Sequence, residues 1–354
     1  MGKPVKQPTA VVCLSPYSGG MELDAIKTAK HLSDITSVTV IAKKDAFIAK
    51  KHNEYVGYND IKLESISFKS SLSLSIIFKI RKIIQKYNIK NILFFGASEL
   101  KSLYFSFMGL DINLMVRHGT TKSSPKKDLF HRLIYSKVTY HIANSKHIQN
   151  NVKKIIPFGK NTRSTVIYPA FEFQDPKPQP HKKLTLLHVG RIAEGKGQKD
   201  AIQACSLLVA NKIDFDFYIV GGFDETYKKE FLSFYDQVPY KEHIHLVGHT
   251  DNVAAYYNKA DIFLFPSYGE GLSNAFIEAL SFGLECICYE NTSFPELKEM
   301  GFEFSLVANE DDHTLALTLL SKADRFKHHR HNTILARELF SLENERKNYM
   351  KILN

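Results

Sequence analysis

Residues 184–220 read LTLLHVGRIAEGKGQKDAIQACSLLVANKIDFDFYIV and contain two apolar runs on either side of an amphipathic segment. The runs 184–189 and 215–220 have the composition of buried strands. Between them, the apolar residues of 198–210 recur with the period of a helix. A strand, a helix and a second strand in this order predict a βαβ unit, whose two strands are parallel.

The same alternation extends along the whole chain of 354 residues. Further strands are predicted at 10–14, 38–42, 91–95, 113–117, 139–143, 164–168, 244–246, 262–265 and 285–289. Further helices are predicted at 22–32, 74–87, 148–155, 227–235, 253–259 and 273–281. The predicted fold class is therefore α/β, with Rossmann-like, doubly wound parallel sheets that carry helices on both faces.

One segment interrupts this alternation. Residues 174–183, QDPKPQPHKK, contain three prolines and no apolar residue that could pack. We predict a first domain over 1–172, a linker over 173–183 and a second domain over 184–334. A helix predicted at 333–353 folds back, so that residues 335–354 complete the first domain. Because ligands of doubly wound sheets bind at the carboxyl ends of the strands, two facing domains predict an interdomain cleft.

The positive charge of the chain is confined to its first half. Residues 1–180 hold 28 Lys and Arg against 12 Asp and Glu, and residues 181–354 hold 19 against 25. A basic first domain can face an anionic membrane or a phosphorylated acceptor, or it can be a merely soluble basic surface. Nucleic acid is not expected as a partner, because no zinc finger, RNP-like motif or recognition helix is present. The basic helix at 74–87 fits either a membrane surface or packing against the sheet.

Cysteines and apolar runs bear on the compartment. Cys13, Cys205, Cys286 and Cys288 lie in apolar stretches and predict small core side chains in a reducing environment. No run of about 18 apolar residues predicts a transmembrane helix, and Pro16 interrupts the short apolar run near the N-terminus, so no signal peptide is expected. We therefore expect a cytoplasmic protein and leave open its attachment to the inner face of the cytoplasmic membrane. No pattern predicts the oligomeric state.

The loop after the strand at 184–189 has the composition of a phosphate-binding loop. HVGRIAEGKG, residues 188–197, combines three glycines with Arg191 and Lys196. Glycines allow a tight backbone path, and two cations can neutralise a diphosphate and donate hydrogen bonds to it. The spacing is neither a P-loop nor GxGxxG, which argues against a dinucleotide oxidoreductase and leaves an ordinary surface turn as the alternative.

Two other strands of the second half end at glycines. Gly222 closes the segment 220–222, where a ligand could approach the backbone closely. Val247 precedes Gly248 at the end of the strand that begins at 244, and backbone groups there could meet a nucleobase. Each feature is equally consistent with a plain turn.

The most specific segment is PSYGEGLSNAFIEAL, residues 266–280. Glu270 lies in a glycine loop, Ser273 or Asn274 can cap the following helix, and Glu278 lies one to two turns into that helix. The amide groups of a helix N-terminus can bind phosphate or sugar hydroxyl groups. The apolar neighbours of Glu278 favour a hydrogen-bonded carboxylate over a solvated one.

These segments, together with SGGME at 18–22, the segment 283–289 and Glu296, resemble the retaining glycosyltransferases of family 4, which have the GT-B fold. The resemblance covers nearly the whole chain and is most specific between residues 184 and 300. It implies that Arg191 and Lys196 hold the diphosphate of a nucleotide-sugar donor and that Glu278 binds its ribose. It also implies that Glu270 contacts the transferred sugar.

The resemblance extends to the first domain. Gly19 and Gly20 would approach the donor phosphates, and amide groups of Gly271, Leu272 and Ser273 would contact the sugar. His118, in MVRHGT, matches a histidine that lies beside the reacting sugar, and the alternative for it is a strand-end histidine with a structural role. We predict His118 and Glu270 as catalytic residues.

The implied function is transfer of a sugar, with retention of configuration, from a nucleotide diphosphate sugar to a hydroxyl group. The family favours a UDP-sugar as donor, and a cell-envelope glycan or lipid-linked acceptor in lipopolysaccharide, capsule or O-antigen assembly. The basic segment 120–127 could help to bind such an acceptor.

No DxD motif lies near a strand end, so no metal or other cofactor is expected. Glu285 departs from the family, which often has proline two residues after the glycine at 283. The alternative is a non-catalytic nucleotide-sugar-binding or scaffold protein with the GT-B fold.

Overall fold

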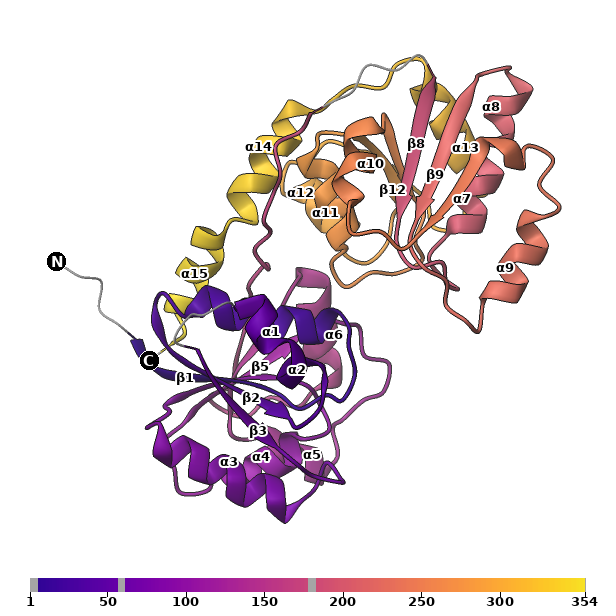
Figure 1. The fold of residues 1–354 in the computed structure, drawn as a ribbon. Helices are drawn as coiled ribbons and strands as arrows, with labels where there is room; N and C mark the ends of the chain where they lie inside the picture. Colours follow the sequence, from indigo (N-terminus) through magenta and orange to yellow (C-terminus); the bar gives the residue numbers. More distant parts are fainter. Residues whose placement is uncertain (1–5, 57–60, 178–182, 354) are drawn as a thin grey trace. The chain divides into compact units, whose positions relative to one another are not determined.

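The structure, a computed structural model, describes residues 6–56, 61–177 and 183–353. The chain folds into two compact units. Unit 1 consists of Met1–Ala170 and Phe340–Asn354, and unit 2 of Phe171–Leu339. Each unit is a parallel sheet with helices on both faces (Figure 1). Residues 178–182 of the predicted linker lie outside the described residues.

The sheet of unit 1 has the strand order β3-β2-β1-β4-β5-β6-β7, with every pair parallel. Its strands are β1 Lys6–Cys13, β2 Thr36–Lys43, β3 Lys62–Ile66, β4 Asn91–Phe95, β5 Asn113–His118, β6 Val138–Ala143 and β7 Arg163–Val166. Its helices are α1 Gly20–Leu32, α2 Phe47–Val56, α3 Leu74–Lys86, α4 Leu100–Ser106, α5 Leu129–Tyr135, α6 Lys146–Ile155 and α15 Leu342–Met350.

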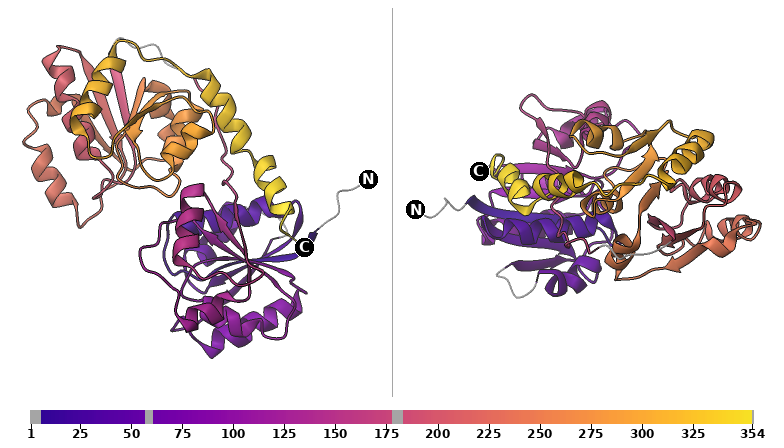
Figure 2. Two further views of the ribbon diagram at one scale, coloured as in Figure 1. Left: turned by 180° about the vertical axis from the view of Figure 1, so that it is seen from behind. Right: turned by 90° about the horizontal axis from the view of Figure 1, so that it is seen from above.

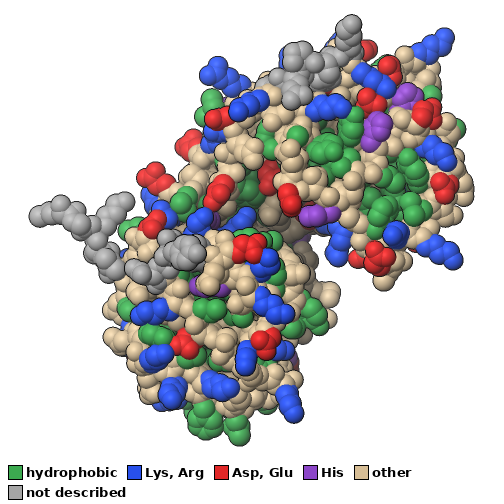
Figure 3. Space-filling model, in the orientation of Figure 1, with side chains coloured by type: hydrophobic (Ala, Val, Ile, Leu, Met, Phe, Trp, Pro, Cys, Tyr) green, Lys and Arg blue, Asp and Glu red, His purple; other side chains and the backbone are tan. Residues whose placement is uncertain are grey.

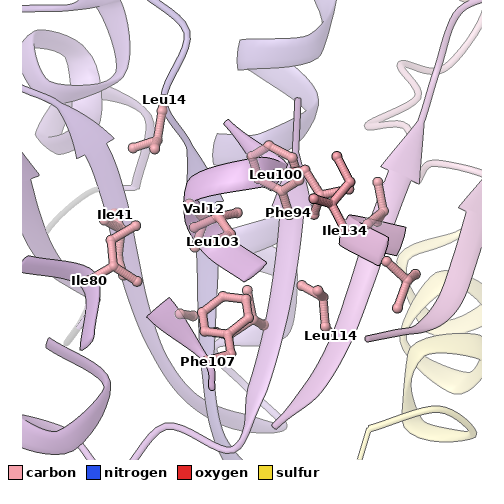
Figure 4. Packing of buried hydrophobic residues seen from close by; sticks show 14 of the residues in the cluster. Val12, Leu14, Ile41, Ile80, Phe94, Leu100, Leu103, Phe107, Leu114 and Ile134 are labelled. Atoms are coloured by element: carbon pink, nitrogen blue, oxygen red, sulfur yellow. The ribbon is translucent and has the colours of Figure 1, made fainter. Parts of the chain in front are cut away.

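Two hydrophobic clusters hold the helices of unit 1 against opposite faces of its sheet. On one face α3, α4, α5 and α6 pack on the strands, and Figure 4 shows Leu103 of α4 and Phe107, which follows α4, against Phe94 and Leu114. On the other face, α1, α2 and α15 bury their apolar residues. Ile76, Ile80 and Ile84 of α3 are buried. Of the two alternatives for this helix, packing against the sheet is therefore confirmed.

The C-terminal segment returns to unit 1, as predicted, but it is not one helix. Helix α14, Arg330–Leu339, belongs to unit 2, and α15 belongs to unit 1, where it lies beside α1 (Figure 2). The hydroxyl of Ser341 accepts a hydrogen bond from the amide of Asn344 at 3.1 Å and so begins a new helix. His31 of α1 lies 2.5 Å from the Glu345 carboxylate and holds α15 in place.

The sheet of unit 2 has the order β10-β9-β8-β11-β12-β13, again with every pair parallel. Its strands are β8 Leu184–Val189, β9 Phe215–Val220, β10 Ile244–Gly248, β11 Ile262–Phe265, β12 Glu285–Tyr289 and β13 Ser305–Val307. Its further helices are α7 Gln198–Ala204, α8 Ser206–Ala210, α9 Lys228–Tyr235, α10 Val253–Lys259, α11 Asn274–Ser281, α12 Phe294–Glu299 and α13 Asp312–Ala323, with a short 3₁₀ turn at Lys241–His243.

Strand order in both sheets places a topological switch point at the centre. The winding reverses between β1 and β4 in unit 1 and between β8 and β11 in unit 2. Ligands of doubly wound sheets bind beyond the carboxyl ends of the strands at this point. In unit 2 the loops that leave the switch point are 190–197 and 266–273, the two segments that the sequence singled out.

Glu285, where the family often has proline, has a structural role in unit 2. Its carboxylate is buried, and it lies 2.9 Å from the ammonium of Lys322 and 3.1 Å from a ring nitrogen of His329. A buried carboxylate requires such partners. The residue thus ties β12 to α13 and to the segment before α14, and it lies away from the loops at the switch point. All four cysteines are buried and free, as expected.

Candidate functional site

The loops that follow β8 and β11 are joined backbone to backbone. The amide of Tyr268 donates to the carbonyl of Gly195 at 2.9 Å, and the hydroxyl oxygen of Ser267 lies 3.3 Å from the same carbonyl oxygen. Their strands are hydrogen-bonded neighbours. Two loops that are far apart in the sequence therefore form one continuous surface, which we call the loop site: residues 190–197 and 266–273.

Two glycines allow the backbone segments around this site to approach closely. A Cβ atom on Gly197 would lie 1.9 Å from the carbonyl oxygen of Pro266, and one on Gly221 would lie 2.0 Å from that of Gly190. Both have positive φ, +73° and +151°, a region that favours glycine. The close approach of the two backbone segments in this turn depends on Gly221. A Cβ on Gly222 would meet nothing within 4 Å, and the contact of Gly222 with a ligand stays a prediction.

Arg191, Lys196 and Glu270 of the loop site each lie close to a group of opposite charge. The ammonium of Lys196 donates to Glu270 Oε1 at 2.7 Å, and the Ser267 hydroxyl donates to the same oxygen at 3.1 Å. Arg191 lies 3.4 Å from the carboxylate of Asp224 with its side chain 66% exposed. One predicted cation thus lies within the loop site against the predicted sugar-binding carboxylate. The other extends into solvent, where it is free to reorient.

A third loop, after β12, is hydrogen-bonded to the loop that carries Glu270. The backbone amide of Glu270 donates to the hydroxyl of Thr292 at 3.1 Å, and the side-chain amide of Asn291 donates to the carbonyl of Ser267 at 2.8 Å. On the other side, the Tyr268 hydroxyl donates to Asp200 of α7 at 2.5 Å. These supporting residues were not predicted from the sequence, because no local pattern reports contacts over 22 to 68 residues.

Helix α11 begins at the loop site, and its cap is as predicted. The hydroxyl of Ser273 accepts from the amide of Phe276 at 3.3 Å. Glu278 is half-buried and accepts from the Tyr257 hydroxyl at 3.1 Å, so the expected hydrogen-bonded carboxylate is confirmed. Burial raises the pKa of Tyr257 well above its ordinary value, which keeps the phenol protonated as a donor.

A buried histidine positions the first loop. His188 Nδ1 lies 3.0 Å from the carbonyl of Leu264, and the amide nitrogen of Gln198 lies 3.1 Å from His188 Nε2 and 3.0 Å from the carbonyl of Arg191. Burial lowers the pKa of His188 to about 4. The neutral ring can therefore donate through Nδ1 and accept from Gln198 through Nε2, which fixes the backbone of Arg191 relative to β11.

This neutral histidine predicts acid sensitivity. The pKa of His188 lies below its ordinary value of 6.5, so the unfolded chain takes up a proton first as the pH falls. Its contribution to stability is complete above about pH 6.5 and is lost towards pH 4, at about 1.4 kcal/mol per pH unit. The slope of the free energy of unfolding against pH, measured by urea denaturation between pH 6.5 and 4.5, should therefore be smaller in His188→Gln by about 1.4 kcal/mol per pH unit. His249→Gln, at an exposed histidine, should leave the slope unchanged; equal slopes for all three proteins would contradict the prediction.

The other predicted residues of unit 2 lie at neighbouring strand ends. Gly271 and Leu272 belong to the loop site, and Val247 is half-buried at the end of β10. The amide of Gly221 donates to the carbonyl of Gly248 at 2.9 Å and joins the ends of β9 and β10. The carboxyl edge of this sheet thus presents a row of glycine turns beside the loop site.

The predicted residues of unit 1 lie at the carboxyl edge of its own sheet. Gly19 and Gly20 begin α1, and a Cβ on Gly20 would meet nothing within 4 Å. His118 ends β5 and is buried, with Nε2 2.9 Å from Nδ1 of His141. Burial and the neighbouring His141 lower the pKa of His118, so this imidazole is neutral. Among the described residues, its Nδ1 atom has no hydrogen-bond partner.

No three or more His, Cys, Asp or Glu side chains within residues 6–56, 61–177 and 183–353 are grouped as ligands for a metal ion. No helix in these ranges has the length and apolar composition needed to cross a bilayer.

Comparison with known proteins shows which proteins the chain resembles. Residues 170–330 match the model of the family described as "Glycosyl transferases group 1". The chain is 33% identical over 149 residues to the amylovoran biosynthesis glycosyltransferase AmsK of Erwinia amylovora, a match that spans 40% of this chain and 36% of AmsK. It is 25% identical over 336 residues to the capsular polysaccharide biosynthesis glycosyltransferase CapH of Staphylococcus aureus, which covers 88% of this chain and 89% of CapH.

The fold has counterparts among solved structures. The crystal structure of HepE from Anabaena in complex with UDP superposes with a TM-score of 0.80 at 16% identity and covers 98% of this chain and 99% of HepE. The predicted GT-B fold of two Rossmann-like domains is confirmed, and the predicted resemblance to glycosyltransferases is confirmed by the family model and by the relatives.

Proposed function

We propose that this protein is a glycosyltransferase that binds a nucleotide diphosphate sugar at the loop site and transfers the sugar to a hydroxyl group with retention of anomeric configuration. The observation that carries the proposal is the 2.7 Å contact between Lys196 and Glu270 at the switch point of unit 2, beside the capped N-terminus of α11. A cation for the diphosphate and a carboxylate for sugar hydroxyl groups are thus held side by side. The names of AmsK and CapH support the same class.

Donor binding follows from the charges of the loop site. The diphosphate would accept hydrogen bonds from Lys196 and from Arg191, which leaves Asp224 to do so, and glycine amides along 190–197 would add further donors. Glu278, already oriented by Tyr257, would accept from the ribose hydroxyls. The nucleotide that HepE holds is UDP, and we propose a UDP-sugar here as well.

In the chemical step, the bond between the anomeric carbon and the diphosphate oxygen breaks, and the electron pair stays on that oxygen. Lys196, Arg191 and the amides of Gly271 to Ser273 stabilise the charge that develops. The acceptor oxygen forms its bond to the anomeric carbon on the same face and gives its proton to the departing phosphate. Glu270 binds sugar hydroxyls while it remains paired with Lys196, so it is not the nucleophile of a covalent intermediate.

The rest of the proposal concerns unit 1 and the cell. Gly19 and Gly20 would approach the donor phosphates, and neutral His118 would accept or donate a hydrogen bond at the reacting sugar. The acceptor is a cell-envelope glycan or a lipid-linked glycan, as in capsule, lipopolysaccharide or O-antigen assembly, and the names of AmsK and CapH point to polysaccharides. We propose that the reaction needs no metal and takes place at the cytoplasmic face of the membrane.

A thermal-shift screen tests donor binding. The purified protein is heated with UDP, GDP, ADP or CMP and with their common sugar conjugates, in EDTA. A ligand that binds only the folded state raises the melting temperature, by about 2.7 kcal/mol of stabilisation at a hundred times its Kd. We expect a clear shift with one base, UDP, and its loss in Glu278→Ala. Absence of a shift with every nucleotide, in folded protein, would contradict the proposal.

A further inference from the structure

Unit 1 exposes large apolar side chains on three neighbouring helices. Seven of the fourteen large apolar residues exposed in the described part of the chain lie on or beside α3, α4 and α5: Leu72, Leu74, Phe78, Met108, Leu129, Phe130 and Leu133. We call these seven residues the apolar rim. Single exposed apolar residues are common, but a group on adjacent elements is typical of an interaction surface.

The three helices lie side by side. Buried residues of α3, α4 and α5 share one hydrophobic cluster. The guanidinium of Arg81 in α3 donates to the carbonyls of Ser106 and Met108, at 3.2 and 2.8 Å, and so joins α3 to the end of α4. On α3, Leu74 and Phe78 are four residues apart and therefore on one face of the helix. Figure 3 shows hydrophobic side chains at the lower end of unit 1, with Lys and Arg side chains distributed above them.

The positive charge of the chain is concentrated next to this rim. Residues 112–171 contain eleven Lys and Arg and a single acidic residue, Asp128. The carboxylate of Asp128 caps α5, where it accepts from the amide of His131 at 3.0 Å and also contacts the His131 ring. Its oxygens are therefore engaged within the helix. The excess of ten positive charges in this segment equals the net charge of the whole chain.

A cavity of about 450 Å³ opens beside α5. Lys127, Arg132 and Lys153 line it together with Ile156, Pro157 and Phe158. Arg132 Nε donates to the carbonyl of Lys127 at 3.0 Å, which orients the guanidinium. None of these three cations forms an ion pair within the described residues. Three cations over an apolar floor, with no counter-charge, suit a phosphate group, whose oxygens match the donor fork of arginine.

The cavity and the rim share a helix. Leu129 lies three residues before Arg132 and four residues before Leu133, so the exposed Leu129 is a neighbour on the helix surface of the cation that lines the cavity and of the second exposed leucine. A free anion would need the cations alone and would gain nothing from the leucines. A lipid phosphate would contact both the cations and the leucines, because the acyl chains of a phospholipid lie beside its headgroup at the surface of a bilayer.

We propose that unit 1 binds the surface of a bilayer of anionic phospholipid, with a lipid phosphate in the cavity beside α5 and the apolar rim inserted among the headgroups. This deepens the membrane part of the proposed function by naming the surface and the lipid chemistry. It stands on residues of unit 1 alone and does not depend on sugar transfer.

Vesicle binding tests the proposal. Co-sedimentation is measured with vesicles of phosphatidylglycerol and phosphatidylcholine in equal parts, and with phosphatidylcholine alone. We expect the cavity variant Arg132→Ala/Lys153→Ala to lose about tenfold more affinity for the anionic vesicles than Lys137→Ala/Lys154→Ala, which removes two exposed charges of the same segment. The rim variant Leu129→Ser/Leu133→Ser should lose binding that Leu317→Ser/Ile334→Ser, at exposed apolar positions of unit 2, retains.

The outcomes distinguish a lipid phosphate from a free phosphate as the ligand of the cavity. They also distinguish bilayer binding by unit 1 from donor binding at the loop site. Equal losses in the cavity variant and its charge-matched control would overturn the cavity as a site, and full binding by the rim variant would overturn a lipid as its ligand. Inorganic phosphate at the ionic strength of a chloride control should displace the protein only weakly; complete displacement would show that the cavity takes a free anion. The nucleotide-induced thermal shift should persist in every variant, so a failure here leaves the loop site untouched.

Discussion

Replacing Lys196 with alanine is expected to lower the turnover number for sugar transfer by about 10²–10³-fold, because the proposed mechanism then loses a cation that stabilises the developing diphosphate charge. The ammonium of Lys196 is held 2.7 Å from Glu270 and is only 30% exposed. A group held in place in this way needs no reorganisation as the charge develops. The measurement is release of the nucleotide from the donor that the screen identifies, with envelope glycan and lipid extracts supplied as acceptors.

Lys199→Ala is the matched control. Lys199 lies three residues further on, in α7, and pairs with Glu230 at 2.6 Å, away from the loop site. This variant should keep its turnover number within about twofold, since surface ion pairs contribute little to stability. Equal turnover in the Lys196 and Lys199 variants, both folded, would remove Lys196 from the reaction.

The second large effect concerns stability. Gly197→Ala is expected to destabilise unit 2 by about 2–5 kcal/mol, from the positive φ and from overpacking combined. The φ of Gly197 is +73°, and its added Cβ would lie 1.9 Å from the carbonyl oxygen of Pro266. Either the two loops separate or the helix α7 shifts, and both changes would disturb the loop site. Urea denaturation measures the loss.

Gly195→Ala separates the two causes. Gly195 has almost the same φ, +75°, but its Cβ would meet nothing within 4 Å. This variant should lose only the backbone contribution, about 1–2 kcal/mol. Equal losses in the two variants would mean that the close approach to Pro266 contributes nothing.

The bounds of the strands were predictable from the sequence where a strand is a short apolar run that ends at a turn. The strands at 91–95, 184–189, 215–220, 262–265 and 285–289 have the predicted bounds, because buried parallel strands are short apolar runs that end at turns. Strand β3, Lys62–Ile66, is an edge strand with polar residues, and it was not predicted. The break between α14 and α15, where Phe340 is buried and Ser341 caps α15, was also not predicted.

The residue types of the candidate site were predictable, but its contacts were not. Glycines, a lysine and a glutamate at strand ends indicated phosphate and sugar chemistry. That Lys196 meets Glu270, 74 residues away, follows only from the adjacency of β8 and β11. The support from Thr292, the buried chain from His188 through Gln198 to Arg191, and the hydrogen bond from Tyr257 to Glu278 all cross between elements. No periodicity in a sequence reports contacts of this kind.

From the sequence, the basic helix at 74–87 fitted either a membrane surface or packing against the sheet. The structure shows that one face of this helix packs on the sheet and that apolar residues of its outer face are exposed. Helix α3 packs its isoleucines on the sheet, yet Leu74 and Phe78 on its outer face are exposed. Apolar residues on the solvent side of an amphipathic helix cannot be told from core residues by period alone. Only the packing of α3, α4 and α5 shows which of them are left without cover.

The central claim is that the loop site holds the diphosphate of a nucleotide-sugar donor. Titration calorimetry of the nucleoside diphosphate selected by the screen, and of its monophosphate, tests this claim in the native protein and in Lys196→Ala. We predict that the native protein prefers the diphosphate by about tenfold or more, as one charge-assisted contact allows, and that the variant loses most of this preference. An unchanged preference in Lys196→Ala, in protein shown to be folded, would place the diphosphate elsewhere and contradict the account.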